Sequence, residues 1–111
     1  LDGAIREALE ETARVFSPRA LLGIYMARSL SAAEREPVTY LRFAFIGTVG
    51  EPEPGRALDH GILRTLWLTA DEIRARRPEH RSPLVMKCID DYLAGQHYPL
   101  SVVYAHPSVA A

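Results

Sequence analysis

The residues best suited to chemistry lie near the start of the chain, where the sequence reads Arg6-Glu7-Ala8-Leu9-Glu10-Glu11. On a helix that turns about 100° per residue, these four charged side chains fall within an arc of roughly 140°. Carboxylates at helical spacing repel one another by roughly a few tenths of a kcal/mol. A divalent cation removes that repulsion. Glu7 and Glu11 can reach one point in space, and Glu10 can bridge to a second ion.

Carboxylate oxygens are hard ligands, so this cluster predicts Mg²⁺ or Mn²⁺ rather than zinc. Such ions share substrate phosphates and lower the pKa of a bound water, which can then attack phosphorus. Arg6, one turn before Glu10, can hold a glutamate in place through a charge-assisted hydrogen bond. The alternative is a solvated acidic helix face that binds nothing, and composition alone favours it.

The rest of the sequence offers no comparable constellation. Its four histidines are scattered without metal-ligand spacing, and neither glycine-rich phosphate-binding motif occurs. Ser82 stands before Pro83, which is typical of a helix start rather than of a nucleophile. The single cysteine, Cys88, excludes an internal disulfide and lies on an apolar helical stripe, so we expect it in the core.

Length and charge narrow the function classes. The chain has 111 residues, which predicts a single domain spanning 1–111. Its formal net charge of −1 argues against holding nucleic acid by bulk charge. No apolar stretch is long enough to span a bilayer, and no leader-like pattern opens the sequence. We therefore expect a cytoplasmic protein without nucleic-acid or membrane partners.

The elements that must position the glutamates alternate between helical and strand patterns. A helix is expected over 1 to about 13, and a polar loop over Arg28–Glu36. A Thr-x-x-Glu capping box predicts a short helix from Thr69 to about Arg76, and Ser82-Pro83 predicts another that ends at Gly95. The expected strands are Ala20–Met26, Val38–Val49 and Ile62–Leu68. The second strand is expected to be mostly buried.

Three strands and one amphipathic helix face make a thin core. Helical patterning also starts at Leu1, which is not a methionine. Both observations predict further strands before the first residue of this sequence.

The glutamate segment resembles the second half of the Nudix box, G-x5-E-x7-R-E-U-x-E-E-x-G-U, and matches the charged positions of R-E-x-x-E-E within it. Tyr40–Phe45 resembles the strand after the Nudix helix, and Leu66–Ile73 resembles the W-[FVL]-x-x-x-E-[LI] stretch of that family. The segments that resemble the C-terminus of the NudJ-like subgroup are Arg81–Val85, Tyr92, Gly95 and Tyr98–Leu100.

This resemblance implies an α/β fold, the Nudix-type α/β/α sandwich with a mixed sheet, whose N-terminal strands are absent from this sequence. Two positions depart from the box, because Ala13 replaces its glycine and Arg14 the aliphatic residue. Val15 and Phe16 can supply the missing packing. The leading glycine and first glutamate of the box would precede Leu1, so we expect a preceding segment of roughly 40 to 50 residues.

The resemblance also assigns roles. It implies that Glu10 and Glu11 are the main Mg²⁺ ligands. Glu7 would be a ligand through water or the base that activates water, and Arg6 would orient it. A further acid often comes from a loop, for which the candidates are Asp59 and, less favoured, Glu53. A solvated loop acid is the simpler interpretation of both.

Arg42 and two aromatic residues leave alternatives open. Arg42 lies within an apolar strand and would need a partner there, either a structural carboxylate or a substrate phosphate. The structural role is favoured. Trp67 and Tyr40 could stack a heteroaromatic ring, although aromatic residues on strands more often belong to the core.

The implied function is Mg²⁺-dependent hydrolysis of phosphoanhydride bonds by a metal-activated water. The NudJ-like resemblance suggests nucleoside di- and triphosphates or hydroxymethylpyrimidine pyrophosphate as the small-molecule substrate. One alternative is a catalytically inactive Nudix module that binds a nucleotide or a protein. Another is an interaction domain whose acidic face only keeps it soluble. A monomer is expected by family analogy.

Overall fold

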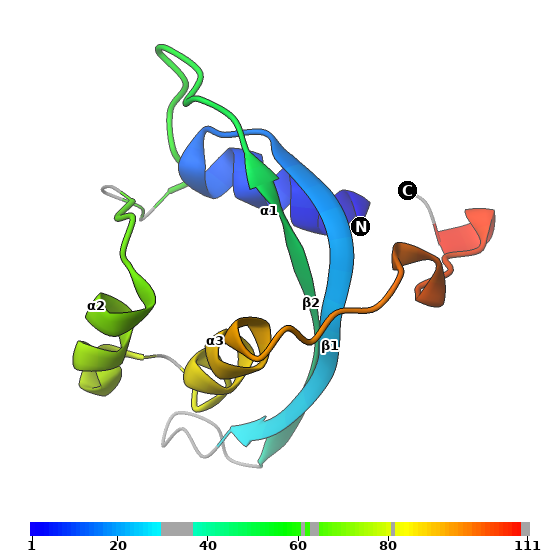
Figure 1. Cartoon of the computed structure of the whole chain (residues 1–111). Helices are drawn as coiled ribbons and strands as arrows, with labels where there is room; N and C mark the ends of the chain where they lie inside the picture. Colours follow the sequence, from blue (N-terminus) through cyan, green and yellow to red (C-terminus); the bar gives the residue numbers. More distant parts are fainter. Residues whose placement is uncertain (30–36, 61, 63–64, 81, 110–111) are drawn as a thin grey trace. The chain divides into compact units, whose positions relative to one another are not determined.

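The computed structural model describes residues 1–29, 37–60, 62, 65–80 and 82–109. Its helices and strands are labelled in Figure 1. They are α1 (Asp2–Thr12), β1 (Phe16–Ser29), β2 (Val38–Val49), α2 (Ala70–Ala75) and α3 (Leu84–Leu93), with the 3-10 turns η1 (Arg77–Glu79), η2 (Leu100–Val102) and η3 (Pro107–Val109). Strands β1 and β2 pair in a two-stranded antiparallel sheet, so the described chain is α/β.

The chain divides into two compact units, and each is described by itself. The first unit comprises residues 1–21, 45–67 and 99–111, and it contains α1. The second comprises residues 22–44 and 68–98, and it contains α2 and α3. The buried apolar side chains of the described residues are Ala13 and Leu21 in the first unit and Leu22, Tyr25 and Met86 in the second.

Helix α1 forms as its pattern predicts and ends in a left-handed residue. Ala13 has φ 61° and ψ 20°, and its N–H donates to the carbonyl of Leu9. A left-handed conformation costs an L-residue about 1–2 kcal/mol, which glycine largely avoids. The Nudix box has glycine at this position. A glycine here would avoid this cost, whereas in this chain an alanine that is only 5% exposed takes the left-handed conformation.

Strands β1 and β2 approach closely in the first unit, at Gly47. A Cβ built on Gly47 would lie 2.6 and 2.7 Å from two ring atoms of Phe16 and would overlap the carbonyl oxygen of Ser17. This approach explains a glycine inside a strand of apolar residues. It also ties the start of β1, directly after α1, to the end of β2.

In the second unit, helix α3 is joined to β1 by polar contacts. The Tyr25 hydroxyl donates to Asp91 Oδ2 over 2.9 Å, and Gln96 Nε2 donates to the carbonyl of Leu22 over 2.9 Å. Burial and the adjacent Asp91 carboxylate raise the pKa of Tyr25 above its usual range. The helix starts at Leu84 with Pro83 as its N-cap, one residue later than the predicted cap at Ser82, although Ser82 Oγ still accepts from the N–H of Leu84. Gly95 follows the helix with φ 86°, at its predicted end.

Two strand predictions were wrong, the first because no described residue of Ile62–Leu68 forms a strand and the second in its bounds. No strand is present at Ile62 or at residues 65–68, and residues 63–64 lie outside the described part. Strand β1 runs over Phe16–Ser29 instead of Ala20–Met26, so it includes Pro18 and Arg28. The remainder of the predicted loop, residues 30–36, lies outside the described residues. A strand persists wherever its backbone finds a partner, and polar side chains can point to solvent from such an edge.

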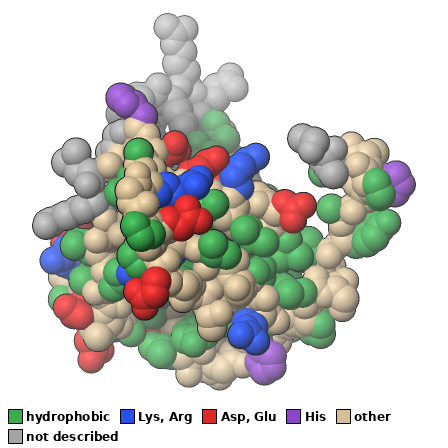
Figure 2. All heavy atoms as spheres, turned by 90° about the horizontal axis from the view of Figure 1, so that it is seen from above, with side chains coloured by type: hydrophobic (Ala, Val, Ile, Leu, Met, Phe, Trp, Pro, Cys, Tyr) green, Lys and Arg blue, Asp and Glu red, His purple; other side chains and the backbone are tan. Residues whose placement is uncertain are grey.

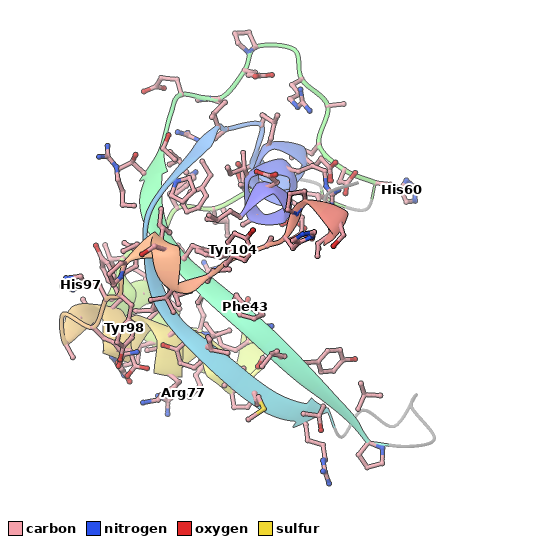
Figure 3. The ribbon with its side chains drawn as sticks, turned by 90° about the vertical axis from the view of Figure 1, so that its right-hand side faces the viewer. Phe43, His60, Arg77, His97, Tyr98 and Tyr104 are labelled. Carbon is pink, nitrogen blue, oxygen red and sulfur yellow. The ribbon has the colours of Figure 1, made fainter. Side chains whose placement is uncertain are left out.

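The prediction that Val38–Val49 is mostly buried was also wrong, although its bounds are those of β2. Its first six residues are exposed, and none of its residues is buried. A sheet of two strands offers few neighbours that could cover both faces. Phe43, for example, stands on β2 with 45% of its surface exposed (Figure 3). Figure 2 shows other hydrophobic side chains exposed between charged ones on the face in view.

Cys88, expected in the core, is only partly buried on α3. Burial raises the pKa of its thiol, while the positive charge of Arg42 acts in the opposite direction. Within the described ranges, no helix combines the length and the apolar character needed to cross a membrane.

Candidate active site on helix α1

Helix α1 carries all four residues of the acidic cluster. Arg6, Glu7 and Glu11 are exposed, and Glu10 is half-buried. Arg6 Nε lies 3.8 Å from Glu10 Oε1, with side-chain exposures of 68% and 39%. An ion pair this exposed contributes about 0–1 kcal/mol to stability. It is therefore a weak tether, which a more strongly charged ligand could displace.

The loop after β2 returns to the C-terminal end of α1. The N–H of Asp59 donates to the carbonyl of Glu10 over 2.9 Å, and the N–H of Glu53 donates to the carbonyl of Ala13 over 2.7 Å. Helix ends leave carbonyl groups without intrahelical partners, and here the loop satisfies two of them. Asp59 is thereby placed in backbone contact with a glutamate of the cluster.

The two candidate loop acids differ in their environment. Glu53 Oε2 lies 3.2 Å from Arg56 Nη1, so its charge is paired within the loop. Asp59 is exposed and bonded through its backbone to Glu10. The arrangement favours Asp59 over Glu53 as a further carboxylate for this site.

Arg14 and Trp67 meet in the same unit. Arg14 Nη1 donates to the carbonyl of Gly50 over 2.9 Å, and its guanidinium carbon lies 4.9 Å from the centre of the Trp67 ring. Trp67 is 59% exposed, so its assignment to the core was wrong. Tyr40, the other aromatic residue expected in the core, is 50% exposed. Residues 65–68, which surround Trp67 in the sequence, do not form a strand that could bury its ring.

The carboxylates of α1 fit a hard divalent cation in chemical type, because they are oxygen ligands exposed on one helix face. They are not drawn together, however. In the part of the chain that the structure describes, no three His, Cys, Asp or Glu side chains are grouped closely enough to hold a metal ion. The roles of Arg6, Glu7, Glu10 and Glu11 therefore remain predictions.

The environment of Arg42 differs from the one that the sequence predicted. Arg42 was expected on a buried strand face, but it is exposed on β2. The physical reason is the two-stranded sheet, which leaves this part of β2 in contact with solvent. An exposed guanidinium needs no buried carboxylate partner, so that argument for a structural role is lost. A role in binding substrate phosphate remains a prediction.

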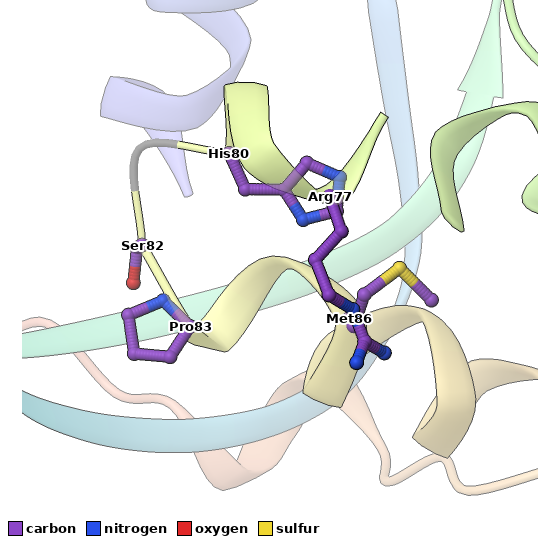
Figure 4. A pocket seen from close by; sticks show the side chains of 5 residues that line it. All are labelled: Arg77, His80, Ser82, Pro83 and Met86. Carbon is purple, nitrogen blue, oxygen red and sulfur yellow. The ribbon is translucent and has the colours of Figure 1, made fainter. Parts of the chain in front are cut away.

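Sequence reasoning missed a depression in the second unit, which Figure 4 shows from close by. It is lined by Arg77, His80, Ser82, Pro83 and Met86. The signal that could have indicated it is the basic stretch Arg74–Ser82.

Comparison with known proteins supplies the family. No protein-family model matches the chain. Phosphatase NudJ of Escherichia coli K12 and of Shigella boydii are both 31% identical to it over 103 residues, covering 93% of this chain and 63% of each relative. A NUDIX hydrolase from Nitrosomonas europaea is 48% identical with a TM-score of 0.83, covering 92% of this chain and 66% of that one. The chain belongs to the Nudix hydrolase family.

Within this family the chain is similar to the NudJ phosphatases, as its C-terminal segments indicated. The structural match confirms the predicted fold class. The chain spans less than two thirds of the length of the curated relatives that it matches. What a whole protein of this kind does is therefore a matter for proposal.

Proposed function

We propose that the protein hydrolyses phosphoanhydride bonds in a small phosphorylated substrate, using Mg²⁺ or Mn²⁺. The observation that carries this proposal is the set of glutamates at Nudix-box spacing on the exposed face of α1. Likeness to a phosphatase and to a NUDIX hydrolase supports the same reaction class. The NudJ-like resemblance suggests nucleoside di- and triphosphates or hydroxymethylpyrimidine pyrophosphate as substrates. We also propose that the protein is a monomer and acts in the cytoplasm.

The charged side chains of α1 have different roles in the proposed reaction. Glu10 and Glu11 hold the cation, and Glu7 acts as a ligand through water or as the base that accepts a proton from the attacking water. Arg6 is a positioning residue, and its ion pair with Glu10, one turn further along the helix, supports this role. The bound cation neutralises phosphate charge and makes water a better nucleophile.

Asp59 extends this arrangement beyond the helix. Its N–H bonds to the carbonyl of Glu10, so the loop and the helix carry their carboxylates on directly connected backbone groups. Loop residues on a rigid support are common positions for binding groups. We therefore include Asp59 as an additional carboxylate of the site.

One observation favours a second candidate, an inactive Nudix module that binds without turnover. The described residues show no converged three-ligand group, and Glu10 is paired with Arg6. Such a module would not need the cation. Metal dependence therefore separates the two candidates.

The test compares Glu11→Gln with Glu51→Gln in the full-length protein. Both glutamates are exposed, but Glu51 is not a position of the box and belongs to the loop after β2. Losing a ligand worth several kcal/mol of transition-state stabilisation should lower turnover at least about 100-fold. Glu51→Gln should retain it. The readout is phosphate release from a panel of nucleotides with Mg²⁺ and with EDTA.

Two results would contradict the proposal. If Glu11→Gln retained turnover close to that of Glu51→Gln, the ligand assignment would be wrong. If the unaltered protein released no phosphate in a metal-dependent way, the inactive module would be the better description. Circular dichroism of each variant ensures that a loss of activity is not a loss of folding.

A further inference from the structure

The depression in the second unit has one cationic wall and one apolar wall. Its volume is about 330 Å³, near the lower end of the range for small-molecule sites, roughly 300–1,000 Å³. Figure 4 shows its five lining side chains, from η1, the segment after it and α3. Met86, which is only 6% exposed, and Pro83 make up its apolar wall. None of the described residues that line it carries a carboxylate.

Arg77 supplies the positive charge of this depression. Its neighbours are already paired, because Arg74 Nη2 lies 2.6 Å from Asp90 Oδ1 and Arg76 Nε lies 4.0 Å from Glu79 Oε2. Arg77 forms no ion pair with any residue that the structure describes, and its side chain extends from the ribbon (Figure 3). An unpaired guanidinium presents a fork of N–H donors that matches the oxygens of a phosphate.

Two polar side chains complete the lining. Ser82 Oγ accepts a hydrogen bond from the N–H of Leu84, which leaves its hydroxyl hydrogen available for another acceptor. His80 Nε2 lies 2.8 Å from the carbonyl of Ile73 and donates to it, which fixes the ring. The remaining nitrogen, Nδ1, can accept a hydrogen bond from a hydroxyl group of a ligand.

We propose that this depression binds the phosphate group of a small phosphorylated molecule. Arg77 provides charge and a bidentate contact, Ser82 donates one hydrogen bond, and Met86 and Pro83 contact the organic part next to the phosphate. The described lining offers no carboxylate that could bind a cation. A purely apolar ligand would leave the guanidinium without a partner. The inference concerns different residues from the proposed hydrolytic site and does not depend on that site's activity.

The test is a titration of the full-length protein with inorganic phosphate in EDTA, followed by amide chemical shifts in two-dimensional NMR. EDTA prevents phosphate from binding through a metal at the glutamates. We expect saturable shifts within residues 77–86. Arg77→Ala should weaken the fitted affinity at least about fivefold, since charged hydrogen bonds are among the stronger ones. Arg76→Ala is the matched control, because it removes the same charge one position away from the lining.

A second arm distinguishes the source of the phosphate group. Adenosine 5′-monophosphate, titrated in the same way, should bind more tightly than inorganic phosphate if the apolar wall contacts an organic group. Equal affinities would identify a site for free phosphate. Either result supports a phosphate site, provided that Arg77→Ala weakens the binding.

The proposal is overturned if sodium chloride at matched ionic strength produces the same shifts, if no shift saturates, or if the Arg76 and Arg77 variants lose affinity equally. Glu11→Gln should bind phosphate in EDTA as the unaltered protein does. Failure of this site would therefore leave the proposed hydrolase untouched, and failure of the hydrolase would leave this site untouched.

Discussion

Replacing Gly47 by alanine tests the close approach of β1 and β2 directly. The new Cβ would lie 2.6 Å from Phe16 Cε1 and 2.7 Å from Phe16 Cζ. Carbon atoms are most favourably separated by about 3.5–4.0 Å, so the ring would have to move by about 1 Å. The Ser17 carbonyl oxygen, which the methyl group would also overlap, belongs to the backbone and cannot rotate away as a side chain can.

The expected loss follows from that geometry. Overpacking usually lowers the free energy of unfolding by about 1–3 kcal/mol. Because one clash is with the backbone, we expect Gly47→Ala to lose about 3 kcal/mol. For a chain of this size, that loss lowers the melting temperature by about 10–20 °C. Gly3→Ala is the matched control, because nothing lies within 4 Å of its Cβ. Alanine in a helix is favoured over glycine by about 0.5–1 kcal/mol, so this variant should be stabilised.

Both variants are measured by urea unfolding of the full-length protein, followed by circular dichroism. Opposite signs for the same chemical change, with a difference of about 3–4 kcal/mol, are expected. A Gly47→Ala variant within about 0.5 kcal/mol of the unaltered protein would show that the strands do not approach as described. Stabilisation of both variants would lead to the same conclusion.

Two further predictions concern the ends of α1 and α3. Ala13→Gly should be less destabilising than Ala8→Gly by about 1–2 kcal/mol, because only Ala13 has a positive φ; equal losses in thermal unfolding would contradict the left-handed conformation. The hydrogen bond from Lys87, and then that from Tyr25, lowers the pKa of Asp91, so its ionised form stabilises the fold above the unfolded pKa of about 3.9 and loses that effect as pH falls through the lower folded value. The melting-temperature deficit of Asp91→Asn should therefore be largest above about pH 5 and shrink below about pH 4, and a constant deficit would refute this explanation.

Features that depend only on a few adjacent residues could be predicted from the sequence. The capping box is one, since Thr69 Oγ1 accepts from the N–H of Glu72 and Glu72 Oε1 accepts from the N–H of Thr69. The helix Asp2–Thr12 and the bounds of Val38–Val49 are others. In each case the interactions that define the element connect near neighbours, or the run of β-branched and aromatic residues is long enough to be unambiguous.

Features that depend on distant partners could not be predicted in this way. The apolar run Ile62–Leu68 has strand composition, but no described part of it forms a strand, because composition does not supply a pairing partner. Arg42 illustrates the same limit for burial. Its apolar neighbours indicated a covered face, but a face is covered only if another element lies on it, and sequence periodicity does not report that.

The candidate site combines both kinds of information, and Ala13 links them. Helical spacing places the glutamates on one face of α1, but the return of the loop is fixed by hydrogen bonds to the carbonyls of Glu10 and Ala13. The left-handed turn at Ala13 ends the helix and sets the direction of its own carbonyl, which accepts the N–H of Glu53. The left-handed conformation of Ala13 thus directs one of the two hydrogen bonds that join the loop after β2 to the end of α1, and the other is made by the backbone of Glu10.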